Sequence, residues 1–195
     1  MGETLTFRTP MARVLTIGVA VVAVVALVYF VSDGGIREAW RSGPTVLCIV
    51  VVTWALFWRP QVQVSDGGVT VANILRTVHV PWPVLRSVDS KWSLTVTGED
   101  VTVSAWAVPA SSGMAARTRR PGARGSQDAP SPLRSTGNAD AAALAIAERR
   151  TALADAGHLK AAPIGTVHSR KSWNVPEAAA IAGSLLLAVA SYLIG

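Results

Sequence analysis

The chain has 195 residues, of which 50% are hydrophobic and only 15% are charged. This composition is too apolar for an ordinary soluble protein and indicates an integral membrane protein with a modest soluble part. The single cysteine, Cys48, excludes an intramolecular disulfide. The net charge of +6 lies between residues 111 and 171, where ten Lys/Arg accompany four Asp/Glu, because the rest of the chain has eight of each.

The first apolar run, residues 14–31, contains eighteen residues without a charge. At about 1.5 Å of rise per residue, a helix of this length covers most of a hydrocarbon core of roughly 30 Å. A cleavable signal peptide is the alternative, because Arg8 and Arg13 precede the run. Tyr29 and Phe30 stand where small residues would mark a cleavage site, so we expect a retained transmembrane helix.

A second apolar run, residues 43–58, follows a short loop that contains Arg37 and Arg41. The run is close to the lower limit of about 17 residues for a span, so a re-entrant or interfacial segment is the alternative. Trp40 and Trp58 lie where interfacial aromatic anchors are expected, which favours a full span. Residues 1–58 are therefore predicted to form an N-terminal segment with a transmembrane hairpin.

Residues 59–110 form the one long stretch with a period of two. Val62 and Val64 alternate with glutamines, and Val101 and Val103 alternate with Thr102 and a serine. This alternation predicts antiparallel strands with one buried face and one wet face. About fifty residues make a thin core, so we expect the domain to need a following helix or the membrane spans for stability.

Short motifs follow one another within this stretch: Trp58-Arg59-Pro60, Asp66-Gly67-Gly68-Val69, Asn73-x-Leu75-Arg76, Val80-Pro81-Trp82 and Ala105-Trp106-Ala107. In this order they resemble the bacterial PH-like domains of small membrane-anchored actinobacterial proteins. One departure is Ala72, where relatives often have a basic residue. The resemblance implies a split barrel of bent antiparallel strands, closed by a C-terminal helix and reached directly from transmembrane helices. It implies no catalysis.

Three residues are candidates for a structural role in the barrel. Trp82 and Trp106 are expected to pack in the core or at a barrel end rather than to stack on a ligand. Asn73, at the end of a strand, is expected to cap the following turn through its side chain.

The resemblance also draws attention to the turn of residues 65–68. Phosphoinositide-binding PH domains hold phosphates with Lys/Arg side chains in this region, whereas here the turn carries Asp66 and no base. A phosphate would lack the charge-assisted donors that offset its desolvation, so specific headgroup binding by the barrel is not expected.

Residues 111–137 are rich in Gly, Pro, Ser and Arg and are predicted to be a basic, disordered linker. Arg117, Arg119, Arg120 and Arg124 are candidates for contact with anionic lipid headgroups, at about 1 kcal/mol per basic residue near the surface. A solvated charge run that only sets the membrane topology is the alternative. Nucleic-acid binding is not expected, because no aromatic residues are interleaved.

A helix is predicted over residues 138–157, and the sequence leaves open whether it closes the barrel. Residues 158–175 are a juxtamembrane connector, and residues 176–194 are a third transmembrane helix. Ala179, Gly183 and Ala190 make one side of this helix small, which suits close helix packing.

The distribution of Lys/Arg predicts the orientation in the cell membrane. Arg8 and Arg13 precede the first span, Arg59 follows the second, and Arg170 and Lys171 precede the third. The loop between the first two spans carries only Arg37 and Arg41. The side of the membrane that holds the β domain carries more basic residues, because the basic linker belongs to that side. The β domain is therefore expected in the cytoplasm of a multi-pass plasma-membrane protein, with the C-terminus outside.

No group of residues suggests catalysis, a cofactor or a small-molecule substrate. His79, His158 and His168 are scattered, and no Cys/His/carboxylate cluster has metal-ligand spacing. We expect a non-enzymatic membrane protein that presents a cytoplasmic PH-like domain to an unidentified protein partner, as an interaction or scaffolding module. An accessory subunit of a larger membrane assembly is the alternative, and an enzyme with an unrecognised site is a third.

Overall fold

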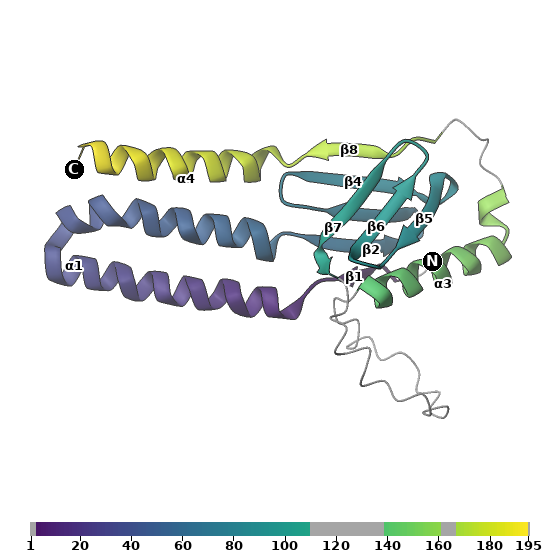
Figure 1. Cartoon of the computed structure of the whole chain (residues 1–195), viewed down its shortest axis with the longest axis horizontal. Helices are drawn as coiled ribbons and strands as arrows, with labels where there is room; N and C mark the ends of the chain where they lie inside the picture. The colour runs from purple at the N-terminus through teal and green to yellow at the C-terminus, as the bar shows by residue number, and fades with distance from the viewer. Residues whose placement is uncertain (1–2, 110–138, 161–166, 195) are drawn as a thin grey trace, which may run out of the picture. The chain divides into compact units, whose positions relative to one another are not determined.

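The computed structural model describes residues 3–109, 139–160 and 167–194 of the chain (Figure 1). The chain divides into two compact units. The β unit comprises Met1–Thr9, Gln61–Asn73 and Thr77–Ser172, and the helical unit comprises Pro10–Pro60, Ile74–Arg76 and Trp173–Gly195. Neither unit is one continuous segment, because the chain passes between them repeatedly.

The larger sheet of the β unit has five strands in the order β1-β2-β3-β4-β8. The strands are β1 (Leu5–Phe7), β2 (Gln61–Ser65), β3 (Gly68–Ala72), β4 (Arg76–Pro81) and β8 (Arg170–Trp173). The antiparallel register of β2 and β3 sets Val62 opposite Val71 and Val64 opposite Val69. Alternate residues of a strand point to one face, and all four of these valines are buried on that face.

The smaller sheet consists of β5 (Leu85–Asp89), β6 (Ser93–Gly98) and β7 (Thr102–Pro109), in the order β5-β6-β7. A short 3-10 turn, η2 (Trp82–Val84), connects β4 to β5. The register slips between Leu85 and Ser87 and again between Ser93 and Thr95. Such bulges bend strands. The two antiparallel sheets confirm the α + β architecture predicted from the sequence.

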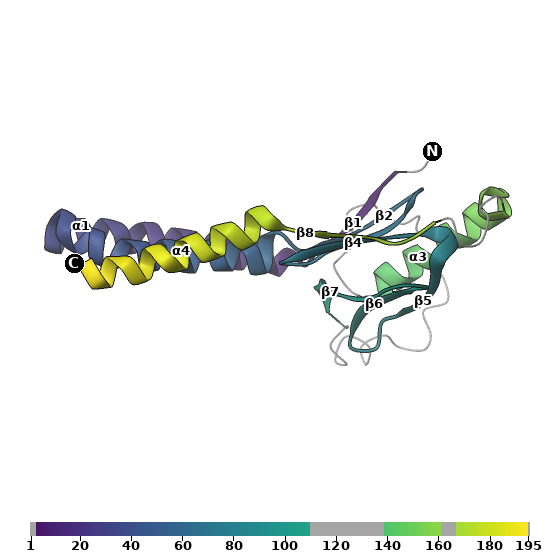
Figure 2. The same ribbon diagram turned by 90° about the horizontal axis from the view of Figure 1, so that it is seen from above.

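A helix completes the core of the β unit. In Figure 2, α3 (Ala139–Asp155) lies between the larger and the smaller sheet, and the 3-10 turn η4 (His158–Lys160) follows it. Ala139, Ala142 and Ile146 repeat at three and four residues, and all three are buried among the core residues of the strands. The question that the sequence left open is thereby answered, because α3 fills the space that the strands alone leave uncovered.

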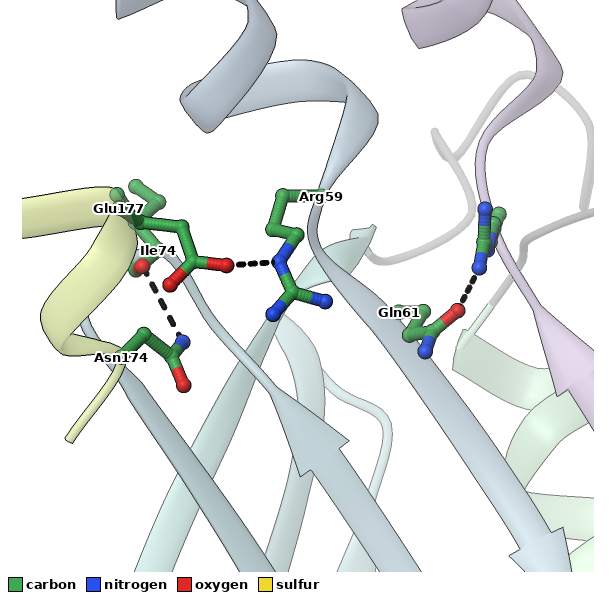
Figure 3. A network of polar contacts seen from close by, with 6 residues as sticks. Arg59, Gln61, Ile74, Asn174 and Glu177 are labelled. Carbon is green, nitrogen blue, oxygen red and sulfur yellow. Dashed lines mark hydrogen bonds and ion pairs between the residues drawn. The ribbon is translucent and has the colours of Figure 1, made fainter. Parts of the chain in front are cut away.

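Two strands of the larger sheet were not predicted from the sequence. β1 has three residues and precedes the first apolar run, while β8 has four residues, all exposed, in the segment interpreted as a connector. Phe7 of β1 joins the core with 2% exposure. Arg8, directly after it, donates a hydrogen bond to Gln61 Oε1 (Figure 3).

The helical unit begins with α1 (Pro10–Thr53), which bends at Gly35. Gly35 has φ 66° and ψ −161°, a backbone conformation that glycine adopts without a steric penalty. The two arms lie side by side in Figure 1, and a Cβ at Gly43 would be 3.4 Å from Leu27 Cδ2 on the opposite arm. A π-helical turn, η1 (Trp54–Trp58), ends the second arm, and the Arg13 guanidinium lies 5.6 Å from the centre of the Trp58 ring.

The last helix, α4 (Val175–Ile194), packs through a different face from the one predicted. Its buried residues are Glu177, Ser184 and Ser191, spaced by seven, whereas a Cβ at Gly183 would meet nothing within 4 Å. The predicted face of small residues is therefore wrong. Serine suits the packing face because its hydroxyl can bond to nearby carbonyls: Ser191 Oγ donates to Arg41 O at 3.1 Å, in the turn where Pro44 lacks an N–H.

Two helices of the described chain are long and apolar enough to cross a membrane by length and composition, Pro10–Trp58 and Val175–Ile194. In their most apolar windows only 11% and 17% of the residues are buried, whereas the core helix of a soluble protein is mostly buried. Large apolar side chains cover their outer surfaces, among them Val22 at 68% and Leu186 at 71% exposure.

The burial of two tryptophans predicts opposite effects of truncation. Trp82 is 3% exposed and its Nε1 donates to Ser65 O at 3.0 Å. Trp82→Ala should cost about 3–5 kcal/mol of stability, as for other buried aromatics. Trp106 is 57% exposed, so Trp106→Ala should change stability by no more than about 0.5 kcal/mol.

Thermal melting and limited proteolysis of the full-length protein in detergent compare the two variants. A Trp106→Ala protein that melts as early as Trp82→Ala would contradict the exposed position of Trp106.

Candidate functional site

The β2–β3 turn, residues 65–68, is closed by its own contacts. Gly68 has φ 148°, and a Cβ there would lie 2.3 Å from Val80 O, so the position requires glycine. Ser65 Oγ donates to Gly68 O at 3.2 Å, and Ser65 O accepts the bond from the indole N–H of Trp82. The turn is thus fixed both by its close approach to β4 of the larger sheet and by a hydrogen bond from η2.

The acidic residue of this turn has a cationic partner on α3. Arg149 Nη2 lies 2.7 Å from Asp66 Oδ1 and also donates to Glu3 O at 3.3 Å. The Arg149 side chain is 22% exposed and Asp66 is 41% exposed. Arg149 of α3 is therefore engaged at this turn by a carboxylate and a backbone carbonyl. The carboxylate of Asp66 offsets the positive charge that would otherwise attract a phosphate.

Asn73 closes the barrel in a way that differs from the predicted turn cap. Its Nδ2 donates to Ser104 O at 2.8 Å, and its Oδ1 accepts from the Trp106 backbone N at 2.9 Å. One side-chain amide thus pairs with the carbonyl and the N–H of alternate residues on β7, as a neighbouring strand would. The bond partners lie about thirty residues away in sequence, so local sequence could not indicate them.

Trp106 was expected in the core or at a barrel end, and with 57% exposure it does not lie in the core. Val103, Ala105 and Ala107 face inward, while Trp106 is in phase with Thr102 and Ser104 on the opposite side of β7. The period-two pattern of β7 already indicated an exposed position for Trp106, because Trp106 alternates in step with the polar residues of the strand and not with the buried ones.

The exposed side of β6 and β7 forms a surface that we call the outer face. Its members are Thr95, Thr97, Thr102, Ser104 and Trp106. The hydroxyls of Thr95 and Ser104 lie 3.0 Å apart across the two strands. The outer face therefore combines one large aromatic ring, a residue type enriched in protein interfaces, with uncharged hydroxyl groups on a hydrogen-bonded sheet, and it carries no basic residue.

The candidate lipid-contacting residues Arg117, Arg119, Arg120 and Arg124 lie outside the described residues, as does the basic linker that contains them. Among the described residues, no group of three His, Cys, Asp or Glu side chains could hold a metal ion.

His79 is a titratable residue of the larger sheet whose pKa is shifted by its surroundings. It lies on β4, and its Nδ1 is 2.8 Å from Thr70 Oγ1 on β3. Partial burial, with the nearby charge of Arg170, lowers the pKa of His79 below its ordinary value of 6.5. The imidazole is therefore neutral at pH 7 and accepts or donates one hydrogen bond within the sheet.

The family model described as Bacterial PH domain matches residues 59–151, which run from before β2 into α3. No curated protein and no solved structure matches the chain. The match confirms the resemblance to bacterial PH domains drawn from the motifs of residues 58–107, and its extent includes most of α3.

The lowered pKa of His79 predicts a pH dependence of stability. The unfolded chain protonates this histidine near its ordinary pKa of 6.5, while the folded chain does so only at lower pH. The unfolded state then binds more protons, so stability should fall as the pH drops through and below about 6.5.

Unfolding midpoints between about pH 8 and pH 5 test this dependence. His79→Gln should flatten the profile, whereas His158→Gln, at an exposed position of η4, should leave it unchanged. Identical slopes for the wild type and His79→Gln would exclude His79 as the cause.

Proposed function

We propose that this chain, whose residues 59–151 match the bacterial PH domain family, is a multi-pass membrane protein that presents this domain to a protein partner at the cytoplasmic face. The observation that carries the proposal is a pair of features in one chain. Apolar helices expose their hydrophobic side chains, and the β unit has a β2–β3 turn closed by an ion pair and an outer face that exposes Trp106.

Membrane embedding is supported by the exposed apolar surface of the helical unit. Val22, Val25 and Leu186 are each more than 60% exposed, and many similar side chains accompany them. Contiguous apolar surface of this extent is unfavourable in water and suited to lipid. The bend at Gly35 divides α1 into two arms, so three crossings are proposed from two apolar helices.

The pairing of β1 with β2 supports two parts of the proposal. The first apolar helix stays in the mature protein, and the second arm of α1 crosses back to the side of the membrane on which the first arm began. β1 precedes α1, β2 follows η1, and the two strands are hydrogen-bonded in one sheet. Both must lie on one side of the membrane, so the segment between them crosses an even number of times. Removal of α1 as a signal sequence would also separate β1 from the sheet. With α4, the C-terminus then lies on the opposite side.

The cytoplasmic side is proposed for the PH domain because basic residues gather there. Arg8, Arg13 and Arg59 flank the hairpin on the domain side, and Arg170 and Lys171 precede α4. The arginines of residues 117–124 add to this charge, and we propose that they contact anionic lipid without headgroup specificity.

A protein partner is favoured over a headgroup or a substrate by the two surfaces of the domain. Arg149 is engaged by Asp66 at the turn, whereas the outer face offers Trp106, a residue type that often dominates protein interfaces. The proposal assigns no catalysis to the chain. An accessory role in a larger membrane assembly is the second candidate, favoured by the open surface around Gly183 of α4.

Cysteine accessibility in intact cells tests the topology. In a Cys48→Ala background, a cysteine at Ile36, which is 86% exposed beside the bend, should react with an impermeant maleimide. A cysteine at Ser87 on β5 should react only after permeabilisation. Ile36 is preferable to Gly35, whose positive φ disfavours a side chain. The reverse pattern would overturn the proposed orientation.

Site-specific photo-crosslinking in native membranes tests the partner surface. A benzophenone amino acid at Trp106 should give a discrete protein adduct, while one at Trp92, which is 82% exposed on the β5–β6 turn, should not. A third probe at Leu186 reports contacts of α4. Adducts at Leu186 alone would favour the accessory subunit, and their absence at Trp106 would remove the outer face as the docking surface.

A further inference from the structure

The β3–β4 loop, Ile74–Arg76, belongs to the helical unit although the strands on either side belong to the β unit. Asn174, the residue before α4, accounts for this. Its backbone N donates to Leu75 O at 2.9 Å, and its Nδ2 donates to Ile74 O at 3.3 Å (Figure 3). Asn174 O in turn accepts the first helical bond, from Ala178 N at 3.1 Å. The loop is thereby tied to the first turn of an apolar helix.

The start of α4 is also tied to the end of the hairpin. Arg59 Nε donates to Glu177 Oε1 (Figure 3), and the Glu177 side chain is only 6% exposed. A carboxylate in the first turn of a helix is additionally favoured by the helix dipole. The two Asn174 bonds hold the loop at the first turn of α4, and the Arg59–Glu177 ion pair fixes that turn against the end of the hairpin.

The loop and the residues at the start of α4 carry exposed aliphatic, aromatic and basic side chains. Leu75 is 46%, Trp173 is 73% and Val175 is 65% exposed. Arg76 follows Leu75 and is exposed as well. In water such a group of side chains is unfavourable, whereas the boundary between headgroups and acyl chains accepts tryptophan rings, aliphatic side chains and arginine together.

We propose that the loop Ile74–Arg76 is a membrane-interface anchor, in which Leu75 inserts beneath the lipid headgroups and Arg76 meets the phosphates. The partner is the phospholipid surface, because the loop is hydrogen-bonded to the residue at which a membrane span begins. The inference rests on the proposed spanning role of α4. It differs from the proposed contact of residues 117–124, because it depends on an apolar side chain and therefore resists salt.

Fluorescence of the full-length chain in vesicles of phosphatidylcholine and phosphatidylglycerol tests the anchor. In a Cys48→Ala background, an environment-sensitive dye is attached to a cysteine at Leu75, at Ser87 or at Leu186. The Leu75 dye should emit to the blue of the Ser87 dye and be quenched several-fold more by lipids spin-labelled near the headgroup. High salt should leave this difference in place.

The Leu186 dye, tested with lipids spin-labelled near the end of the acyl chain, separates the failure of this inference from that of the proposed function. Leu186 lies near the middle of α4, so a spanning α4 places it deep in the hydrocarbon core. Quenching at Leu186 by these lipids without quenching at Leu75 by the headgroup-labelled lipids would overturn the anchor alone, and no quenching at Leu186 by the deep label would overturn the spanning role of α4. Asn174→Ala, which removes the bond to Ile74 O, should reduce quenching at Leu75 and spare Leu186. Unchanged quenching at Leu75 in this variant would show that Asn174 does not position the loop.

Discussion

The pairing of β1 with β2 is the constraint on which the rest of the structure depends. Three residues that precede the first apolar helix hydrogen-bond to the strand that follows the second arm. The whole helical hairpin is therefore inserted in the chain between two paired strands of one sheet. The bend at Gly35 provides the reversal, and contact of Arg13 with Trp58 brings its two ends together.

The core of the β unit is completed by residues that lie far from its central strands in the sequence. The strands bury mainly valines, which offer limited apolar area for each residue. α3 contributes Ala139, Ala142 and Ile146 to the same core, and Phe7 adds an aromatic ring from the other end of the chain. The domain thus depends on elements that lie on both sides of its central strands in the sequence; the family match includes most of α3 but not Phe7.

The polar contacts of the β2–β3 turn follow from the same packing. Arg149 reaches Asp66 because α3 is seated on the sheet, and this ion pair engages the acidic residue of the turn. Asn73 bonds the backbone of β7 on either side of Ala105, which holds Trp106 on the outer face. The domain therefore directs its cationic group inward to the fold and its aromatic group outward.

The sequence by itself determined the apolar helices, the period-two strands, the motif order of a PH domain and the buried position of Trp82. These properties are local, since helix length, alternation and turn residues can be read from neighbouring positions. Tertiary structure decided the short strands β1 and β8, the partner of Asp66, the packing face of α4 and the role of Asn73.

Each of these depends on groups far apart in the chain, and strands of three or four residues have no period to detect. Trp106 belongs to neither group. Its alternation in step with Thr102 and Ser104 could be read from neighbouring positions, but the size of its apolar ring suggested a place in the core. Alternation, not hydrophobicity, decided its side, because successive residues of a strand must point to opposite faces.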